Sequence, residues 1–207
     1  MSLSSCARTA FFGVGTLGAE HSNIWLTSRT RMEAERRLLL YGKISHLVIS
    51  YYSIILIIFN VFSNFFEERY TYYYEINIAL SVIILCGSLI SHGFRFEKTA
   101  ASHRDCYLKL QELFSSPLTG QEKDSRYSQI LYGYPNHGTQ DYNNMIVREI
   151  LFFKKNLANS TGPILLSKYN IVSFFVWKAL LVISVAAVFL IPVVLFGIAH
   201  LEFLNGV

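Results

Sequence analysis

Two long runs without a charged residue lie close together in this chain of 207 residues. The runs are residues 44–66 and 76–94, and only residues 67–75 separate them. A helix rises about 1.5 Å per residue, so either run can cross a hydrocarbon layer about 30 Å thick. Because the connection is short, the two helices must run antiparallel. The sequence therefore predicts a membrane protein in which residues 44–94 form a transmembrane hairpin.

A third apolar stretch, residues 171–200, precedes a short tail of residues 201–207. It contains Pro192, which is expected to kink the helix, and membrane helices tolerate such a kink. The stretch predicts a third transmembrane helix, and the alternative is a helix that lies on the membrane or packs against the hairpin. The predicted fold class is an all-α membrane protein: a helical hairpin, a small cytoplasmic helical block and a C-terminal transmembrane helix.

The positive charges around the hairpin predict its orientation. Lys and Arg gather before the first run and just after the second, whereas the connecting loop holds one Arg and three Glu. Short loops rich in Lys and Arg stay in the cytoplasm. We therefore expect a cytoplasmic N-terminus, a cytoplasmic segment after residue 94, and a C-terminus on the opposite, periplasmic side.

Outside the spans, residues 1–27 are expected to form a disordered or loosely helical leader, and residues 28–43 a basic amphipathic lead-in. Residues 95–170 predict a cytoplasmic block that is helical throughout, with one helix continuing from the second span across Phe94. Pro117 and Gly120 should break that helix, and Asp124 or Ser125 should cap the next one. Apolar residues recur at helical spacing in this next helix; they are Tyr127, Ile130, Leu131 and Tyr134. So small a core predicts a homo-oligomer.

The composition argues against several kinds of site. The net charge of +4 is modest and forms no dense basic patch, so direct nucleic-acid binding is not expected. Cys6, Cys86 and Cys106 lack the spacing of metal ligands, so we expect neither a metal nor a cofactor.

Polar residues form a narrow stripe on each span of the hairpin. Such groups need partners in hydrocarbon, so both stripes should face protein or water. One interpretation is packing between helices; the other is a water-filled path formed when several copies assemble. The stripe residues are His46, Ser50, Ser53, Asn60 and Asn64 in the first span and Asn77, Ser81, Ser88 and His92 in the second.

A short motif in the cytoplasmic region carries a family resemblance. It consists of Tyr134, Pro135, Asn136, His137, Asp141 and Tyr142. Together with the basic lead-in and the hairpin, it resembles the SLATT-domain family over residues 28–160, in the branch associated with reverse transcriptases. The resemblance implies a membrane effector of bacterial conflict systems, located in the inner membrane. It also implies a trigger, either a retron-like reverse transcriptase or a nucleotide-signal system. The third span goes beyond the family's two-span core.

His137 and Asp141 also suggest an enzymatic alternative, since residues four apart share a helix face. No nucleophile or third ligand stands nearby in the sequence. The structural alternative places Asn136 in the turn after Pro135, with Asp141 capping the next helix and bonding His137. In that case a neutral residue at position 141 should be tolerated.

These patterns favour a non-enzymatic effector that oligomerises and permeabilises the inner membrane, which would arrest growth or kill the cell. The alternative is a membrane anchor or scaffold that recruits a soluble partner and conducts nothing.

Overall fold

A computed structural model describes residues 22–68, 72–159 and 162–204 of the chain, and nearly all of its regular structure is helical. This confirms the predicted all-α membrane fold. The elements are α1 (Ser22–Val61), α2 (Ser63–Glu67), α3 (Tyr73–Phe94), α4 (Phe96–Ser115), α5 (Gly120–Tyr132), α6 (Thr139–Val147), the π-helical turn η2 (Arg148–Phe152), β1 (Ala158–Asn159), β2 (Gly162–Pro163) and α7 (Lys168–Leu204). Of the predicted leader, residues 1–21 lie outside the described residues and residues 22–27 belong to α1.

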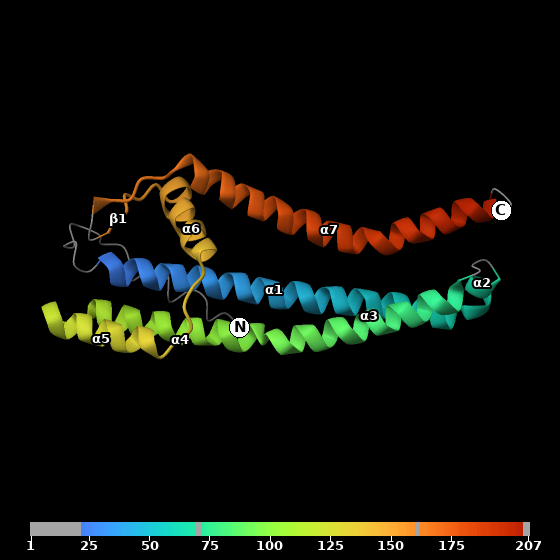
Figure 1. Cartoon of the computed structure of the whole chain (residues 1–207), viewed down its shortest axis with the longest axis horizontal. Coiled ribbons are helices and arrows are strands. Elements are labelled where there is room, and N and C mark those ends of the chain that lie inside the picture. Colours follow the sequence, from blue (N-terminus) through green and yellow to red (C-terminus); the bar gives the residue numbers. More distant parts are fainter. Residues whose placement is uncertain (1–21, 69–71, 160–161, 205–207) are drawn as a thin grey trace, which may run out of the picture.

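The hairpin consists of α1 and α3, which run antiparallel and meet at the end that carries α2 (Figure 1). Near this tip the Tyr73 hydroxyl donates a 2.9 Å hydrogen bond to the Phe59 carbonyl oxygen, and the two rings stack with centroids 6.1 Å apart. Aliphatic side chains along both helices point outward, among them Ile57, Ile78 and Leu85. Such a surface suits lipid rather than water.

The third long helix, α7, runs beside α1 and ends near the hairpin tip (Figure 1). It is long and apolar enough to cross a membrane, as are α1 and the helical stretch that begins with α3. Pro192 lies inside it, and the helix bends along its length, as the sequence predicts (Figure 1). The hydroxyls of Tyr51 and Tyr52 on α1 donate hydrogen bonds to carbonyl oxygens of α7.

The other helices form a block at the opposite end from the tip. Here α4 packs along the first half of α1, α5 packs on α4, and α6 lies between α1 and α7 (Figure 1). One core cluster joins Ile24 to Cys106, Leu110 and Leu113. The predicted apolar face of the second block helix packs against this cluster through Tyr127, Ile130, Leu131 and Tyr134. Because α1 contains 40 residues, a single helix about 60 Å long connects this block to the hairpin.

Three local predictions were wrong. The helix expected to continue across Phe94 is interrupted at Arg95, whose φ of 46° is left-handed. The second block helix begins at Gly120, after the N-cap residue Thr119, rather than at Asp124 or Ser125; glycine readily adopts the positive φ of 55° found at this start. Residues 95–170 are not helical throughout, since the chain leaves helix after η2 and forms β1 and β2 before α7.

Candidate functional site

The motif that includes Asp141 lies against the first half of α1. The Arg37 guanidinium donates two hydrogen bonds to the Asp141 carboxylate, from Nε to Oδ1 at 2.7 Å and from Nη2 to Oδ2 at 3.0 Å. Asp141 is fully buried, and its Oδ2 also accepts a hydrogen bond of 3.0 Å from the Gly138 backbone N–H at the start of α6. The Asp141 carboxylate therefore caps the N-terminus of α6 and also binds α6 to α1.

A second arginine of α1 lies deeper in this junction. Arg31 is only 1% exposed, and its Nη1 donates a 2.7 Å hydrogen bond to the Pro135 carbonyl oxygen. His103 of α4 and His137 of the motif lie close enough for their charges to interact with it. Burial lowers the pKa of both imidazoles, and the charge of Arg31 lowers each further, while Asp141 acts in the opposite direction. The junction therefore disfavours additional positive charge.

Three nitrogen atoms of this junction are buried without a hydrogen-bond partner among the described residues. They are Nε of Arg31, Nδ1 of His103 and Nδ1 of His137. Buried polar groups without partners are destabilising, so the junction is less fully satisfied than an ordinary core. We define the buried junction as Arg31, Arg37, His103, His137 and Asp141.

The contacts of the motif fit the structural alternative better than the enzymatic one. Asn136 Oδ1 accepts a 3.0 Å hydrogen bond from the His137 N–H and so holds the turn, as expected. Asp141 caps α6 but bonds Arg37 in place of the expected His137. Burial raises the pKa of the Cys106 thiol, which makes it a poor nucleophile. Within the described ranges, no group of three metal-ligating side chains comes together. The arrangement suggests a non-catalytic role.

Further ion pairs connect α1 to its neighbours. Glu35 pairs with Arg104 of α4. Glu33 accepts a hydrogen bond of 3.0 Å from Arg36 and one of 2.8 Å from Arg148 of η2. Burial raises the pKa of the Glu33 carboxyl, against the opposing effect of Arg36 and then of Lys178. The first half of α1 is thus held from two sides, by α4 and by the segment that follows α6.

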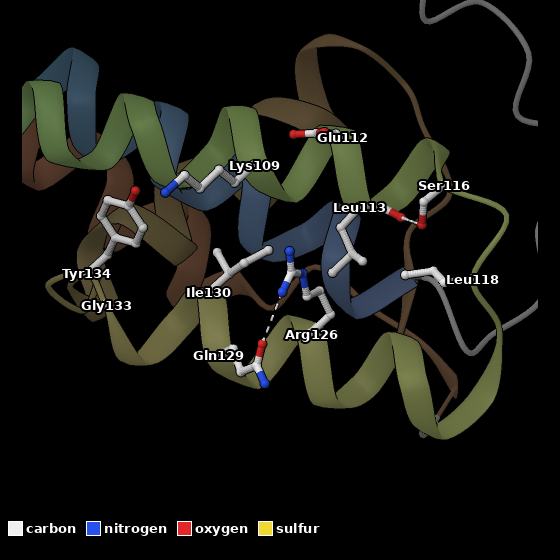
Figure 2. Close-up of a pocket in the computed structure, with 10 residues that line it drawn as sticks. All are labelled: Lys109, Glu112, Leu113, Ser116, Leu118, Arg126, Gln129, Ile130, Gly133 and Tyr134. Carbon is white, nitrogen blue, oxygen red and sulfur yellow. Dashed lines mark hydrogen bonds between the residues drawn. The ribbon is translucent and has the colours of Figure 1, made fainter.

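A cavity of about 690 Å³ lies between α4 and α5, away from the buried junction (Figure 2). Its wall carries Lys109, Arg126 and Glu112 beside apolar residues such as Leu113. The Lys109 ammonium lies 5.2 Å from the Tyr134 ring centroid, and Arg126 donates a 3.4 Å hydrogen bond to Gln129 (Figure 2). Glu112 offsets part of this positive charge, and none of the junction residues lines the cavity, so it is a weaker candidate for a site.

Part of the predicted polar stripe is engaged within the hairpin. Asn77 Nδ2 donates to Asn60 Oδ1 at 3.0 Å, and Asn60 Nδ2 lies 3.4 Å from Asn77 Oδ1, so the two amides link α1 to α3. The Ser53 hydroxyl donates to the Ile49 carbonyl oxygen at 2.8 Å. The Ser81 hydroxyl bonds the Asn77 carbonyl oxygen in the same way. These groups are satisfied in a single copy of the chain.

The rest of the stripe has no such partners. These side chains are exposed along α1, α2 and α3 and make no hydrogen bond to any described residue; they are His46, Ser50, Asn64, Ser88 and His92. Each is surrounded by apolar neighbours on a surface suited to lipid. We call this set the unpartnered stripe.

Sequence reasoning did not identify Arg31, Arg37 or His103 as site residues, because the two arginines were counted only as charges flanking the span. A signal was present in the spacing of α1. Arg31 falls on the same helical face as Ser28, Ala34 and Glu35, and all four are buried. An arginine in register with small residues indicates a buried position rather than a solvent-facing one.

The fold and these sites define a class: an all-α membrane protein in which a helical block folds back on the first of three long apolar helices. The chain belongs to the family described as SMODS and SLOG-associating 2TM effector domain family 5, whose family model matches residues 18–198. This is the SLATT-domain family that the sequence resembles. The resemblance was expected to cover residues 28–160, with the third span beyond it. The match instead extends past residue 160 and includes most of α7. The comparison with curated proteins and that with solved structures each found no match to the chain.

Proposed function

We propose that this chain is the membrane effector of a bacterial anti-phage or conflict system, and that it oligomerises and permeabilises the inner membrane. The family description supports the effector role, since it names a two-span effector domain. The single observation that supports permeabilisation is the unpartnered stripe, which leaves polar side chains on lipid-facing helices.

The physical argument rests on the cost of polar groups in hydrocarbon. A hydroxyl, amide or imidazole without a partner is unfavourable in lipid and gains free energy when it meets water or another polar group. When copies associate, Ser50 and Ser88 can meet partners in neighbouring chains or line a shared aqueous path. Ser53 and Ser81 gain nothing comparable, because each already bonds a backbone carbonyl.

The block is connected to the stripe in a way that suits a trigger. The junction residues Arg31 and Arg37 lie on the helix that carries His46 and Ser50, with no break between them. A change at the junction can therefore rotate or shift the first span as a unit. A trigger that raises the conducting population from 1% to 99% must supply about 5.5 kcal/mol of differential binding.

The proposal also includes the orientation of the chain in the membrane and the nature of its partner. The excess of Lys and Arg on either side of the hairpin supports a cytoplasmic block, and a third span would then put the C-terminus in the periplasm. A cytoplasmic partner could then reach the junction; a retron-like reverse transcriptase or a nucleotide-signal system is the candidate, in keeping with the family resemblance. Co-purification of the effector with the product of a neighbouring gene would test this part.

Liposome dye release tests the conduction directly. Because conduction is proposed to await a trigger, the product of the neighbouring gene is added. The protein is reconstituted at equal density as wild type, as Ser50→Leu with Ser88→Leu, and as Ser53→Leu with Ser81→Leu. We expect the first pair to abolish release while cross-linking still detects oligomers, and the second pair to leave release near the wild-type level. The two variants add the same side chains to the same two helices, so only the position in the stripe differs.

A second candidate function is a non-conducting anchor that recruits a soluble partner. The hydrogen bonds between Asn60 and Asn77 favour it, because they show that polar residues of the stripe can act as links between helices. If wild-type liposomes retain their dye while the block still captures its partner, the anchor function stands and the pore is excluded. If both serine variants released dye at the wild-type level, the unpartnered stripe would not form the pore wall.

A further inference from the structure

A second cavity, of about 320 Å³, lies where α1, α6 and α7 come together. Its polar wall holds four cations, Arg36, Arg37, Arg148 and Lys178, and one carboxylate, Glu33. These residues come from three separate elements, α1, η2 and α7, whose arrangement Figure 1 shows.

The cations exceed the negative charge available to them. Glu33 is already bonded to both Arg36 and Arg148, and Arg37 is committed to Asp141. Lys178 forms no ion pair among the described residues, and its ammonium lies 5.8 Å from the Phe174 ring centroid. Each arginine also has N–H groups beyond those it uses on Glu33. The cavity is therefore prepared for an anion.

The same cavity is also lined by apolar side chains next to or within the membrane-spanning parts of the chain. Leu40 and Tyr41 precede the uncharged run of the first span, and Leu180 and Leu181 lie in the first turns of the apolar run of α7. Trp177, which precedes Lys178 in the sequence, also lines the cavity. Trp and Tyr favour the membrane–water interface, so the cavity lies at the level of the lipid headgroups.

We propose that this cavity binds the phosphodiester headgroup of one anionic phospholipid. The phosphate lies among Arg36, Arg148 and Lys178, and the acyl chains follow the apolar surfaces of α1 and α7 into the bilayer. Basic pockets between helices on the cytoplasmic side are suited to anionic headgroups. A free phosphate would use the cations but would leave Leu40, Leu180 and Leu181 against water, so the apolar wall favours a lipid.

Such a lipid would connect three elements that protein contacts join only in part. It would bring α7 against the junction end of α1 and neutralise the cluster of positive charge around Glu33. This inference rests on the chain spanning a membrane and does not depend on whether the assembled protein conducts. Its failure would leave the dye-release experiment unaffected, and failure of dye release would leave the lipid site standing.

The test is lipid titration of the full chain in a neutral detergent, read by native mass spectrometry and by the shift in the melting temperature. The probes are dioleoylphosphatidylglycerol, dioleoylphosphatidylcholine and soluble glycerol 3-phosphate. We expect the wild type to retain one phosphatidylglycerol and to be stabilised by it. Equal stabilisation by glycerol 3-phosphate would replace the lipid with a free anion, and equal retention of phosphatidylcholine would remove the role of charge; either result overturns the proposal.

The variant Arg36→Gln with Lys178→Gln removes two cavity cations that lie on exposed parts of their helices. Each Lys or Arg near the membrane surface strengthens the binding of an anionic lipid by about fivefold. Loss of both cations should therefore weaken phosphatidylglycerol binding by about 25-fold. The matched control is Lys43→Gln with Lys98→Gln, which removes two exposed cations near the same interface but outside the cavity. It should change binding less than twofold. A similar loss in both variants would show general surface attraction and overturn the site.

Two measurements separate a lost site from a lost fold. The melting temperature without added lipid should agree within a few degrees between the cavity variant and its control. Lys178→Arg keeps the charge and should retain phosphatidylglycerol. If Lys178→Arg with Arg36 intact lost the lipid as completely as the double variant, charge at position 178 would not explain binding and the proposal would fall.

Discussion

The Tyr52 hydroxyl donates a 2.8 Å hydrogen bond to the carbonyl oxygen of Val188, which lies four residues before Pro192. In an uninterrupted helix this carbonyl would accept the backbone N–H of residue 192, which proline lacks. The adjacent Tyr51 hydroxyl bonds the Phe189 carbonyl oxygen at 3.1 Å. Two tyrosines of α1 thus bond backbone carbonyls of α7 in the turn before Pro192, at a depth where water is scarce.

This relationship predicts a specific non-additivity. Tyr52→Phe should destabilise the wild type by about 1 kcal/mol, because the Val188 carbonyl then lacks a partner in hydrocarbon. In a Pro192→Ala background the same change should have little effect, because the introduced alanine supplies the missing N–H. A double-mutant cycle on denaturant unfolding in detergent measures the coupling. Equal costs of Tyr52→Phe in both backgrounds would contradict this account of the bend.

Because Arg37 and Asp141 form an ion pair, we predict a large loss of stability when the Asp141 carboxylate is replaced by a neutral amide of the same size. Asp141→Asn should cost about 2 kcal/mol, because the carboxylate is fully buried and its loss leaves the half-buried Arg37 guanidinium facing a neutral amide. From sequence alone a neutral residue at 141 is expected to be tolerated, whereas the contact with Arg37 leads us to predict a loss of stability. Thermal unfolding of the purified protein is the measurement.

The control for Asp141→Asn is Arg36→Gln, which removes an exposed guanidinium and leaves Glu33 paired with Arg148. Exposed pairs contribute less than about 1 kcal/mol, so its melting temperature should stay close to that of the wild type. Arg37→Lys keeps the charge but cannot form both hydrogen bonds, so it should fall between the two. A melting temperature of Asp141→Asn equal to that of Arg36→Gln would mean that the pair does not hold α6 on α1.

Much of this fold could be predicted from sequence because its signals are local. The uncharged runs, their short connection and the apolar spacing of Tyr127, Ile130 and Leu131 are each visible within one or two helical turns. The stripe residues could also be found, since Asn60 and Asn77 stand out in apolar surroundings. The alignment of α1 with α3 decides which stripe residues have a hydrogen-bond partner, and no local sequence pattern gives that alignment.

The buried junction could not be predicted, because its partners lie far apart in the chain. Arg37 and Asp141 are separated by 104 residues, and only the packing of α6 on α1 brings them together. Before that packing is known, Arg37 cannot be distinguished from Arg36, which stays exposed. The break at Arg95 was also missed, since neither Gly nor Pro marks it and the nearest glycine, Gly93, remains helical.

The junction also predicts a pH dependence. The pKa of His103 and that of His137 are both lowered in the folded protein from their ordinary value of 6.5, by burial first and then by Arg31. The unfolded chain therefore binds these protons more readily. The resulting stability is fully present above about pH 6.5 and is lost as the pH falls through the folded-state pKa values. The melting temperature should decline as the pH is lowered from about 7.5 to about 5.5.

The variant His103→Gln with His137→Gln should reduce this decline, because the titrating groups are removed. His92→Gln is the control, since His92 is exposed on α3 and should leave the pH dependence unchanged. Arg37 repels the His103 proton and Asp141 attracts it. An unaltered slope in the double variant would assign the pH dependence to other groups, such as Glu33.

Arg95, between α3 and α4, has a left-handed backbone conformation, so we predict that glycine is favoured at this position. Arg95 has a φ of 46°, a conformation that costs about 1 kcal/mol for a residue with a Cβ and almost nothing for glycine. Arg95→Gly and Arg95→Ala remove the same charge and differ only in that backbone preference. The glycine variant should therefore be more stable than the alanine variant by about 1 kcal/mol, measured by denaturant unfolding followed by circular dichroism. If alanine proved as stable as glycine, α3 and α4 would have joined into one helix, and the helical content of that variant should rise.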